Sequence, residues 1–409
     1  MDLPIRAYDP ERDLDHVLRT WLEVGWLDSP DKKDALQAFF EPANVEVGLI
    51  DDEAECSVHW VPGEIQYEQS RLGLCAVTAV TTSHIGRRQG LASRLTARAL
   101  QQGAEAGHAV SALGMFEQGF YDRVGFGTGA YDNQLQFDPA NLLVDHIPYR
   151  RPVRVTMDEW ADIHAAMRYR LGSHGAVYLD PPRLVEGEVG FADNPFALGY
   201  RDEDGVLTHM VYGDLKGEHG PFAINAIAYQ STDQLLELLR LLRELGDQFR
   251  SVKMIEPAHV QLQALLREPL RERQRSINSE MESFNRSMAW WQLRVLDVPA
   301  CVAARSWTGE PVRFNLTLTD PLSGRLADGW PGVAGDYTIT IADESSAESG
   351  HADGLPTLTT GVAAFTRLWF GVASATTLAV TDPIDAPAHL LSALDDALLL
   401  PRPLPGWQF

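Results

Sequence analysis

The segment Ala76–Leu95, AVTAVTTSHIGRRQGLASRL, constrains the fold more than any other part of the sequence. Its first five residues, AVTAV, form a short run rich in β-branched side chains, which favours a strand. The residues after Gly90 are rich in helix formers, and Leu91, Leu95 and Ala99 recur at a four-residue spacing. The segment therefore predicts a strand, a loop and a helix in immediate succession.

The loop inside this segment predicts an anion-binding site. A helix that begins directly after a strand directs its free N–H groups and the positive end of its dipole at one spot. Gly90 and the small Ala92 would let the backbone approach a phosphate, and Arg87 and Arg88 would add charge. These residues alone leave a second interpretation open, in which the glycine only makes a tight turn and the arginines form a solvated face.

A second strand-and-helix unit lies further along the chain. The run FAINAIAY, residues 222–229, predicts a strand, and an amphipathic helix follows it with Ser231 or Thr232 as its N-cap. Two units of the same order indicate a duplicated domain, although no letter-for-letter repeat accompanies them.

The last part of the chain, from about residue 291, predicts a different kind of domain. Two stretches alternate apolar and polar residues, as strands with one buried face do. Their apolar members are Phe314, Leu316 and Leu318 in the first stretch and Tyr337, Ile339 and Ile341 in the second. A hydrophobic helix is expected over residues 361–374, and its apolar side chains fit either core packing or the lining of a lipid cavity.

These sequence patterns predict the fold class and the domains. A chain of 409 residues is long enough for about two to four domains. A proline-containing stretch over residues 137–155 has the character of a crossing between domains. We therefore expect an α+β protein with domains at residues 1–145, 146–290 and 291–409.

Charge and composition narrow the classes of partner. The net charge of −23 argues against nucleic acid or an anionic membrane. A solubility role is the ordinary explanation of such a charge, and it would also suit a cationic substrate. Cys56, Cys75 and Cys301 lie far apart and form no CxxC pair, which favours reduced thiols. The 12 histidines show no ligand spacing, so we expect no metal site.

The sequence also predicts where the protein works. No basic segment followed by an apolar stretch opens the chain, and no run approaches the roughly 20 apolar residues that cross a bilayer. We therefore expect no membrane span and a cytoplasmic location.

Two motifs resemble those of a known superfamily. RRQGLA, residues 87–92, resembles the pyrophosphate-binding loop of the GNAT superfamily of acyl-CoA N-acyltransferases. FYDRVGF, residues 120–126, is similar to the F-Y-x-x-x-G-F segment of the same superfamily. The loop after residue 229 has neither the arginine nor the glycine, so the second copy is expected to be degenerate. Tandem N-acetyltransferase domains and a third α+β domain resemble the Eis family, whose members end in a sterol-carrier-protein-like domain and assemble as homohexamers.

This resemblance implies a set of site residues for the co-substrate acetyl-CoA. The end of the first strand would offer backbone groups to the pantetheine arm and the thioester, and the loop would wrap the pyrophosphate. The strand residues are Val80, Thr81 and Thr82; the loop residues are Arg88, Gln89, Gly90, Leu91, Ala92 and Ser93; Phe116 and Glu117 would make a further contact.

The same resemblance implies two catalytic groups. Tyr121 matches the general acid, and a phenol with a pKa of about 10 can protonate a leaving thiolate. Phe409 matches the last residue of the family, whose α-carboxylate serves as the base, and partial burial would raise the low pKa of such a group. The expected reaction is direct transfer of an acetyl group to a primary amine of a small molecule, such as an aminoglycoside or a polyamine, or of a lysine-type side chain. A non-catalytic carrier of a lipid or hydrophobic ligand is the alternative.

Overall fold

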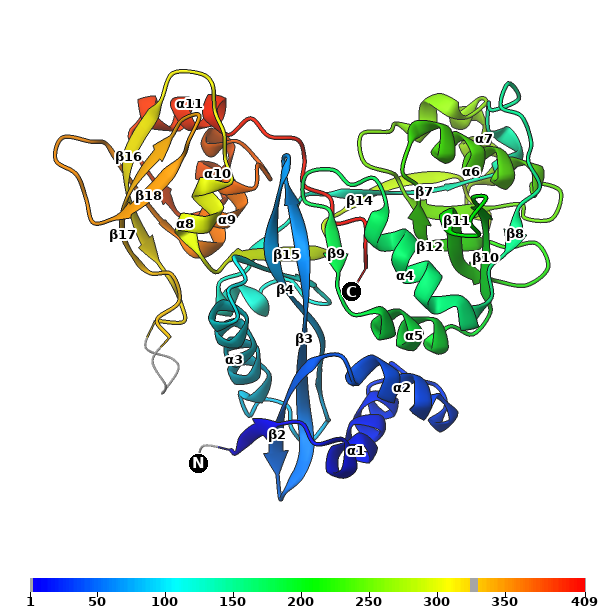
Figure 1. Ribbon diagram of the computed structural model, residues 1–409, viewed down its shortest axis with the longest axis horizontal. Helices are drawn as coiled ribbons and strands as arrows, with labels where there is room; N and C mark the ends of the chain where they lie inside the picture. Colours follow the sequence, from blue (N-terminus) through cyan, green and yellow to red (C-terminus); the bar gives the residue numbers. More distant parts are fainter. Residues whose placement is uncertain (1–2, 324–329, 409) are drawn as a thin grey trace.

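Three mixed sheets organise the molecule, and each forms the centre of one lobe (Figure 1). The computed structural model describes residues 3–323 and 330–408. The chain leaves the third lobe after its last helix, and its last described residues lie where the first and second lobes meet (Figure 1). Within the described residues, no helix has the length and apolar character needed to cross a bilayer.

The first lobe contains an eight-stranded sheet in the order β1-β2-β3-β4-β5-β15-β6, with β9 paired to β3. The strands are β1 (Ile5–Ala7), β2 (Asn44–Ile50), β3 (Glu53–Tyr67), β4 (Ser70–Thr82), β5 (Val110–Gly114), β6 (Gly127–Thr128), β9 (Val177–Leu179) and β15 (Trp291–Val295). The helices of this lobe are α1 (Pro10–Glu23), α2 (Lys33–Phe40) and α3 (Leu91–Glu105), with the 3-10 turns η1 (Pro30–Lys32) and η2 (Tyr121–Val124). The predicted strand and helix at residues 76–107 are confirmed as the end of β4 and as α3.

The second lobe contains a seven-stranded sheet in the order β14-β7-β13-β12-β11-β10-β8. Its strands are β7 (Asp132–Phe137), β8 (Val153–Arg154), β10 (Pro195–Arg201), β11 (Leu207–Leu215), β12 (Phe222–Ala228), β13 (Val252–Ile255) and β14 (Phe284–Met288). Its helices are α4 (Trp160–Tyr169), α5 (Pro182–Phe191), α6 (Thr232–Glu244) and α7 (Pro269–Ser276), with η3 (Pro139–Asn141), η4 (Met157–Glu159) and η5 (Leu262–Leu265). The predicted strand and helix after residue 222 are confirmed as β12 and α6.

The third lobe contains a five-stranded sheet in the order β18-β17-β16-β19-β20. The strands are β16 (Val312–Thr319), β17 (Gly335–Ile341), β18 (Ser346–Ser349), β19 (Thr357–Gly361) and β20 (Ile384–Asp385), and the helices are α8 (Val298–Ala303), α9 (Val362–Trp369), α10 (Ala375–Thr381) and α11 (Ala388–Ala397). The predicted apolar face of β16 is buried. The helix expected over residues 361–374 is shorter, because α9 ends at Trp369 and Gly371 takes a φ of 60°. Phe365 and Trp369 of α9 pack into the core, as the core-packing interpretation requires.

The sheets share strands across the expected domain boundaries. β7 precedes residue 145 and belongs to the second sheet, whereas β15 follows residue 290 and belongs to the first. β15 pairs antiparallel with both β5 and β6, so it completes the first sheet from a distant part of the chain. The boundaries at residues 145 and 290 stay predictions, because the strands interlock across both.

Candidate active site

The site lies where β4 and β5 stop pairing. These strands run parallel, and their ladder extends from Leu74–Val110 to Val77–Leu113. β4 continues beyond this ladder to Thr82, whereas β5 ends at Gly114. The ends of the two strands therefore frame an opening in the sheet.

A β-bulge shapes the β4 side of this opening. The register of β4 against β3 shifts between Thr78 and Thr81, so that Ala79 and Val80 stand opposite the single residue Val58. Ala79 has a φ of 49°, a left-handed conformation that is uncommon for a residue with a side chain. A bulge leaves backbone groups outside the ladder. This distortion was not predicted from the sequence, and the bulged residues Ala79 and Val80 line the opening.

The loop from β4 to α3 has an open helix N-terminus at the place where the sequence predicts an anion cradle. Gly90 is the N-cap of α3, with a φ of 76° and no side-chain cap, so the first turn of the helix keeps its N–H groups available. Arg87, Arg88 and Gln89 are exposed beside it. Arg88 also has a positive φ of 63°. These features bring exposed cationic side chains and uncapped N–H groups to one place.

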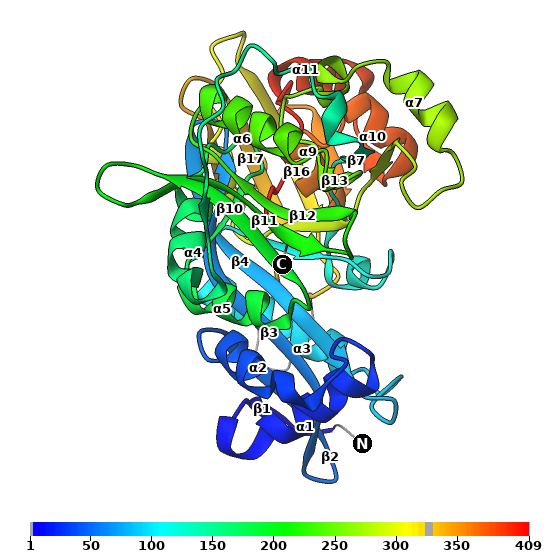
Figure 2. The same ribbon diagram turned by 90° about the vertical axis from the view of Figure 1, so that its right-hand side faces the viewer.

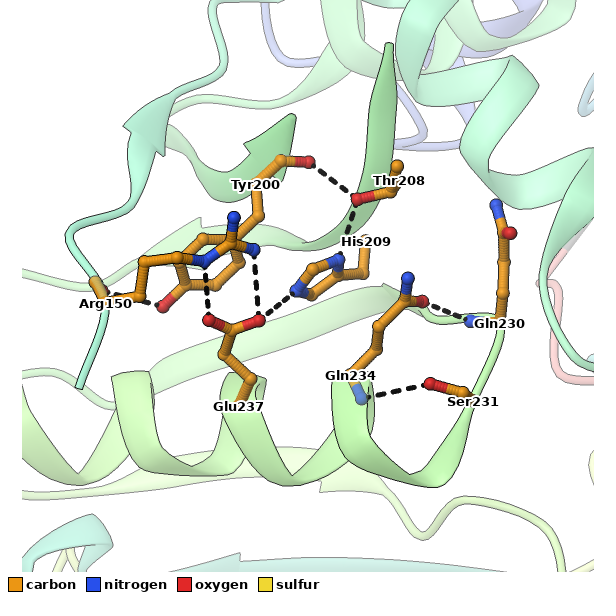
Figure 3. A network of polar contacts seen from close by, with 8 residues as sticks. All are labelled: Arg150, Tyr200, Thr208, His209, Gln230, Ser231, Gln234 and Glu237. Atoms are coloured by element: carbon orange, nitrogen blue, oxygen red, sulfur yellow. Dashed lines mark hydrogen bonds and ion pairs between the residues drawn. The ribbon is translucent and has the colours of Figure 1, made fainter. Parts of the chain in front are cut away.

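In the second lobe, the corresponding helix α6 has side-chain hydrogen bonds at its N-terminus (Figure 3). Ser231 caps α6 by accepting a hydrogen bond from the N–H of Gln234 at 3.3 Å. The side chain of Gln234 in turn accepts one from the N–H of Gln230 at 2.7 Å. The N-terminus of α6 therefore has a side-chain cap that α3 lacks, in keeping with the degenerate second copy that the sequence predicts.

Figure 3 also shows what the rest of α6 does. Glu237 Oε1 accepts a hydrogen bond from Arg150 Nε at 2.7 Å, and Glu237 Oε2 accepts one from Arg150 Nη2 at 3.0 Å. His209 Nε2 lies 2.9 Å from the same Oε2 atom. Burial lowers the pKa of His209, so its imidazole is neutral at pH 7. The cluster ties α6 to β11 and to the segment before β8, which is a structural task.

A cavity of about 360 Å³ occupies the opening between β4 and β5. Residues 77–80 of β4 and residues 114–116 after β5 line it, together with the buried ring of Tyr121. The remaining lining residues are Trp21 of α1, Trp26, Phe39 of α2, and Glu188 and Phe191 of α5. The cavity is thus built jointly by the first and second lobes.

Tyr121 is held in its protonated form. Its side chain is 2% exposed and makes edge contacts with the rings of Phe116 and Phe120, at centroid distances of 5.9 and 4.9 Å. Burial raises the pKa of the phenol above its ordinary value of 10. The hydroxyl therefore carries its proton throughout the neutral range.

Strand β15 fixes the turn η2 that carries Tyr121. Gln292 Nε2 donates to Asp122 Oδ1 at 2.8 Å, and Arg294 Nη1 donates to the carbonyl of Val124 at 2.6 Å. Arg294 is fully buried, and its Nη2 lies 2.5 Å from Asp320 Oδ2 of the third lobe. The third lobe is thereby connected to the turn through one arginine.

The chain end approaches the same cavity from the second lobe. The carbonyl of Pro405 accepts hydrogen bonds from Arg170 Nη2 at 3.1 Å and from the N–H of Val177 at 2.9 Å. Trp407 is 4% exposed, and its indole N–H donates to the carboxyl group of Glu188. Phe409 itself lies outside the described residues, but the residues before it are anchored beside the cavity wall.

The structure brings together part of the predicted set. Val80, Phe116 and Tyr121 line the cavity, and Arg88, Gln89, Gly90, Leu91, Ala92 and Ser93 form the cradle and the first turn of α3. The hydroxyls of Thr81 and Thr82 bond to Ser57 and Cys56, and neither residue is among those that line the cavity. Glu117 is exposed and is not among the residues that line the cavity.

Sequence reasoning missed the aromatic lining and Glu188. Burial raises the pKa of the Glu188 carboxyl from 4.5 to about 8. The available signal was the pair Gly187 and Gly190, which flank Glu188 in VEGEVGF and indicate a helix that another element approaches closely.

Two family models match the chain. A model of the acetyltransferase (GNAT) domain matches residues 5–129, and a model of the sterol carrier protein domain matches residues 298–405. The chain therefore contains a GNAT acetyltransferase domain and a sterol carrier protein domain. No curated protein sequence matches it.

Solved structures share the fold over the whole chain. A probable N-acyltransferase from Enterococcus faecalis V583 has 15% identity and a TM-score of 0.78, with 100% of both chains covered. A GCN5-related N-acetyltransferase from Kribbella flavida has 18% identity and a TM-score of 0.74, with 100% of this chain and 99% of that chain covered. Eis1 from Mycobacterium abscessus has 16% identity and a TM-score of 0.74, with 99% of this chain and 100% of that chain covered. The predicted Eis-like architecture is confirmed as a fold.

Proposed function

We propose that this protein transfers the acetyl group of acetyl-CoA to a primary amine of a small molecule or a lysine-type side chain. The observation that carries the proposal is a cavity lined by both the β4 bulge and the buried phenol of Tyr121, with the uncapped N-terminus of α3 one loop after β4. The cradle suits the pyrophosphate, and the bulge suits the pantetheine arm and the thioester.

The chemistry proposed for the site is direct transfer. The neutral amine attacks the thioester carbon, and backbone N–H groups near Val80 stabilise the oxyanion that forms. The C–S bond then breaks, and Tyr121 donates its proton to the departing sulfur. A thiolate in this apolar cavity holds a proton more tightly than in water, which favours transfer from a phenol of raised pKa.

The base in this proposal is the α-carboxylate of Phe409, which takes a proton from the substrate ammonium and so yields the neutral amine that attacks. Trp407 supports the role because its buried ring fixes the chain end against the wall of the cavity. We further propose a cytoplasmic enzyme that assembles as a homohexamer, and light scattering of the purified protein would test the assembly.

A test of the function compares thiol release from acetyl-CoA across a broad amine panel for three proteins. Tyr121→Phe should lower kcat by roughly 100-fold or more, because it removes the proton donor but keeps the ring. The control Tyr131→Phe alters an exposed phenol and should turn over like the wild type. If none of the amines in the panel caused the wild type to consume acetyl-CoA, the alternative of a non-catalytic carrier would replace this proposal.

A further inference from the structure

Glu188 reaches the cavity because α5 lies unusually close to α2. A Cβ on Gly187 would stand 2.5 Å from the Cβ of Phe39, and one on Gly190 would stand 2.6 Å from the Cβ of Ala35. The glycines therefore let the two helices pack almost backbone to backbone, as their proximity in both ribbon views indicates (Figure 2). This packing directs a carboxylate from the second lobe into a cavity of the first.

The carboxylate of Glu188 has no cation beside it. In the part of the chain that the structure describes, it is desolvated by burial and accepts a hydrogen bond from Trp407, and it enters no ion pair with a lysine or arginine. A buried carboxylate without a cation is costly, and proteins usually pair one or leave it protonated. Burial accordingly raises its pKa to about 8.

The walls around Glu188 are aromatic. The rings of Trp21, Trp26, Phe39 and Phe191 line the same cavity. Trp21 contacts Phe191 at a centroid distance of 5.6 Å and Trp26 at 5.0 Å, so these rings form one connected surface. Faces of aromatic rings attract ammonium groups, and a single carboxylate among them fixes the position of the charge.

We propose that Glu188 binds an ammonium group of the acceptor substrate, distinct from the nitrogen that is acetylated. The inference rests on the proposed function, because the attacking nitrogen must be neutral and must lie near Val80 and Tyr121 of the first lobe. Glu188 comes from the other lobe, so it meets a different part of the substrate. The preferred substrates therefore carry a second cationic group.

The test compares α,ω-diamines with monoamines of the same chain length, in the wild type and in Glu188→Gln. A hydrogen-bonded charge pair predicts that the wild type has a KM roughly 10- to 100-fold lower for the diamine. Glu188→Gln should bring the ratio of the two KM values close to one. Glu186→Gln is the matched control, because Glu186 lies on the same helix and pairs with Arg183 at 2.8 Å; it should keep the preference of the wild type.

Calorimetry of diamine binding without acetyl-CoA separates the two proposals. Binding that is present in the wild type and in Glu186→Gln, but lost in Glu188→Gln, supports the ammonium site even if no amine is acetylated. Acetylation with the same diamine preference in Glu188→Gln would overturn the role of Glu188 and leave the proposed function intact. Thermal unfolding of each variant checks that the near-isosteric changes preserve the fold.

Discussion

Glu188 links the protonation of one side chain to the stability of the molecule. Its carboxyl loses its proton near pH 4.5 when exposed to water but near pH 8 when folded. Between these values the folded state binds more protons than the unfolded state, so the free energy of unfolding falls as the pH rises. The contribution of Glu188 is fully present below pH 4.5 and is lost as the pH passes through about 8.

Glu188→Gln should therefore be neutral near pH 4.5 and stabilising in mild alkali. The gain in free energy of unfolding relative to the wild type should reach as much as roughly 5 kcal/mol above pH 8, because the variant has no carboxylate to bury. Denaturant unfolding at pH 4.5, 6.5 and 8.5 measures the difference, and Glu186→Gln should show little of it. A difference that did not change with pH would contradict the buried environment inferred for Glu188.

Individual residues of the candidate site differ in how well they could be predicted from the sequence. Gly90 and Tyr121 belong to short motifs whose members lie close together in the chain, so local pattern sufficed. Ala79 could not be foreseen, because its strain arises from the register of β4 against β3. Glu188 required the approach of α5 to α2, and only its flanking glycines hinted at that contact.

At the scale of secondary structure, the turn η2 depends on a strand that is far away in sequence. Arg294 of β15 bonds to the carbonyl of Val124, and its guanidinium is neutralised by the equally buried Asp320. Gly125 makes room for it, since a Cβ there would stand 1.7 Å from Arg294 Nη1. The orientation of Tyr121 therefore rests on contacts that the third lobe completes.

Asp320→Asn should test this dependence. The change leaves a buried guanidinium without its counter-charge, so the free energy of unfolding should fall by roughly 3 to 5 kcal/mol. The turn should also lose its fixed position, so kcat should fall even where the variant is fully folded. Denaturant unfolding measures the free energy of unfolding, and steady-state turnover at a temperature well below unfolding measures kcat.

Glu68→Gln provides the control for that experiment. Glu68 pairs with Arg305 at 2.6 Å, which also joins the first and third lobes, but it lies at the turn between β3 and β4 and outside the cavity. It should lower stability by less and leave kcat unchanged. If Asp320→Asn lost stability but kept the kcat of the wild type, the turn would not depend on the ion pair.

Elements with their own periodicity were predicted well. α3, α6 and the alternating strands β16 and β17 have apolar spacings that identify them without any partner. The placement of β7, β9 and β15 was not predictable in this way. These strands pair with segments far away in sequence, and strand pairing of this kind depends on the whole fold rather than on local composition.

At the scale of the whole molecule, the tail joins all three lobes. It leaves the third lobe, and its Pro405 carbonyl bonds to Arg170 of the second lobe and to Val177 of the first. Its Trp407 donates to Glu188, which lines the cavity between these two lobes. Trp407, which is buried and bonded to Glu188, anchors this end of the tail. The role of the last carboxylate stays a proposal.

Adding two glycines after Phe409 should separate anchoring from chemistry. The extension keeps Trp407 in place but moves the terminal carboxylate, so kcat should fall by roughly 100-fold while the KM for the amine changes little. Steady-state kinetics measure both constants. The control replaces Gln408 with alanine, which leaves the terminus at its natural position. Full activity in the extended protein would show that the tail serves only for packing and that its terminal carboxylate takes no part in the reaction.

The shared strands have a consequence for how the protein is made. Synthesis proceeds from the N-terminus, and domains generally fold as they emerge from the ribosome. Here β5 pairs with β15, which is made only after the entire second lobe. The nascent first sheet therefore stays incomplete, with an unpaired edge that favours aggregation, until β15 has been synthesised.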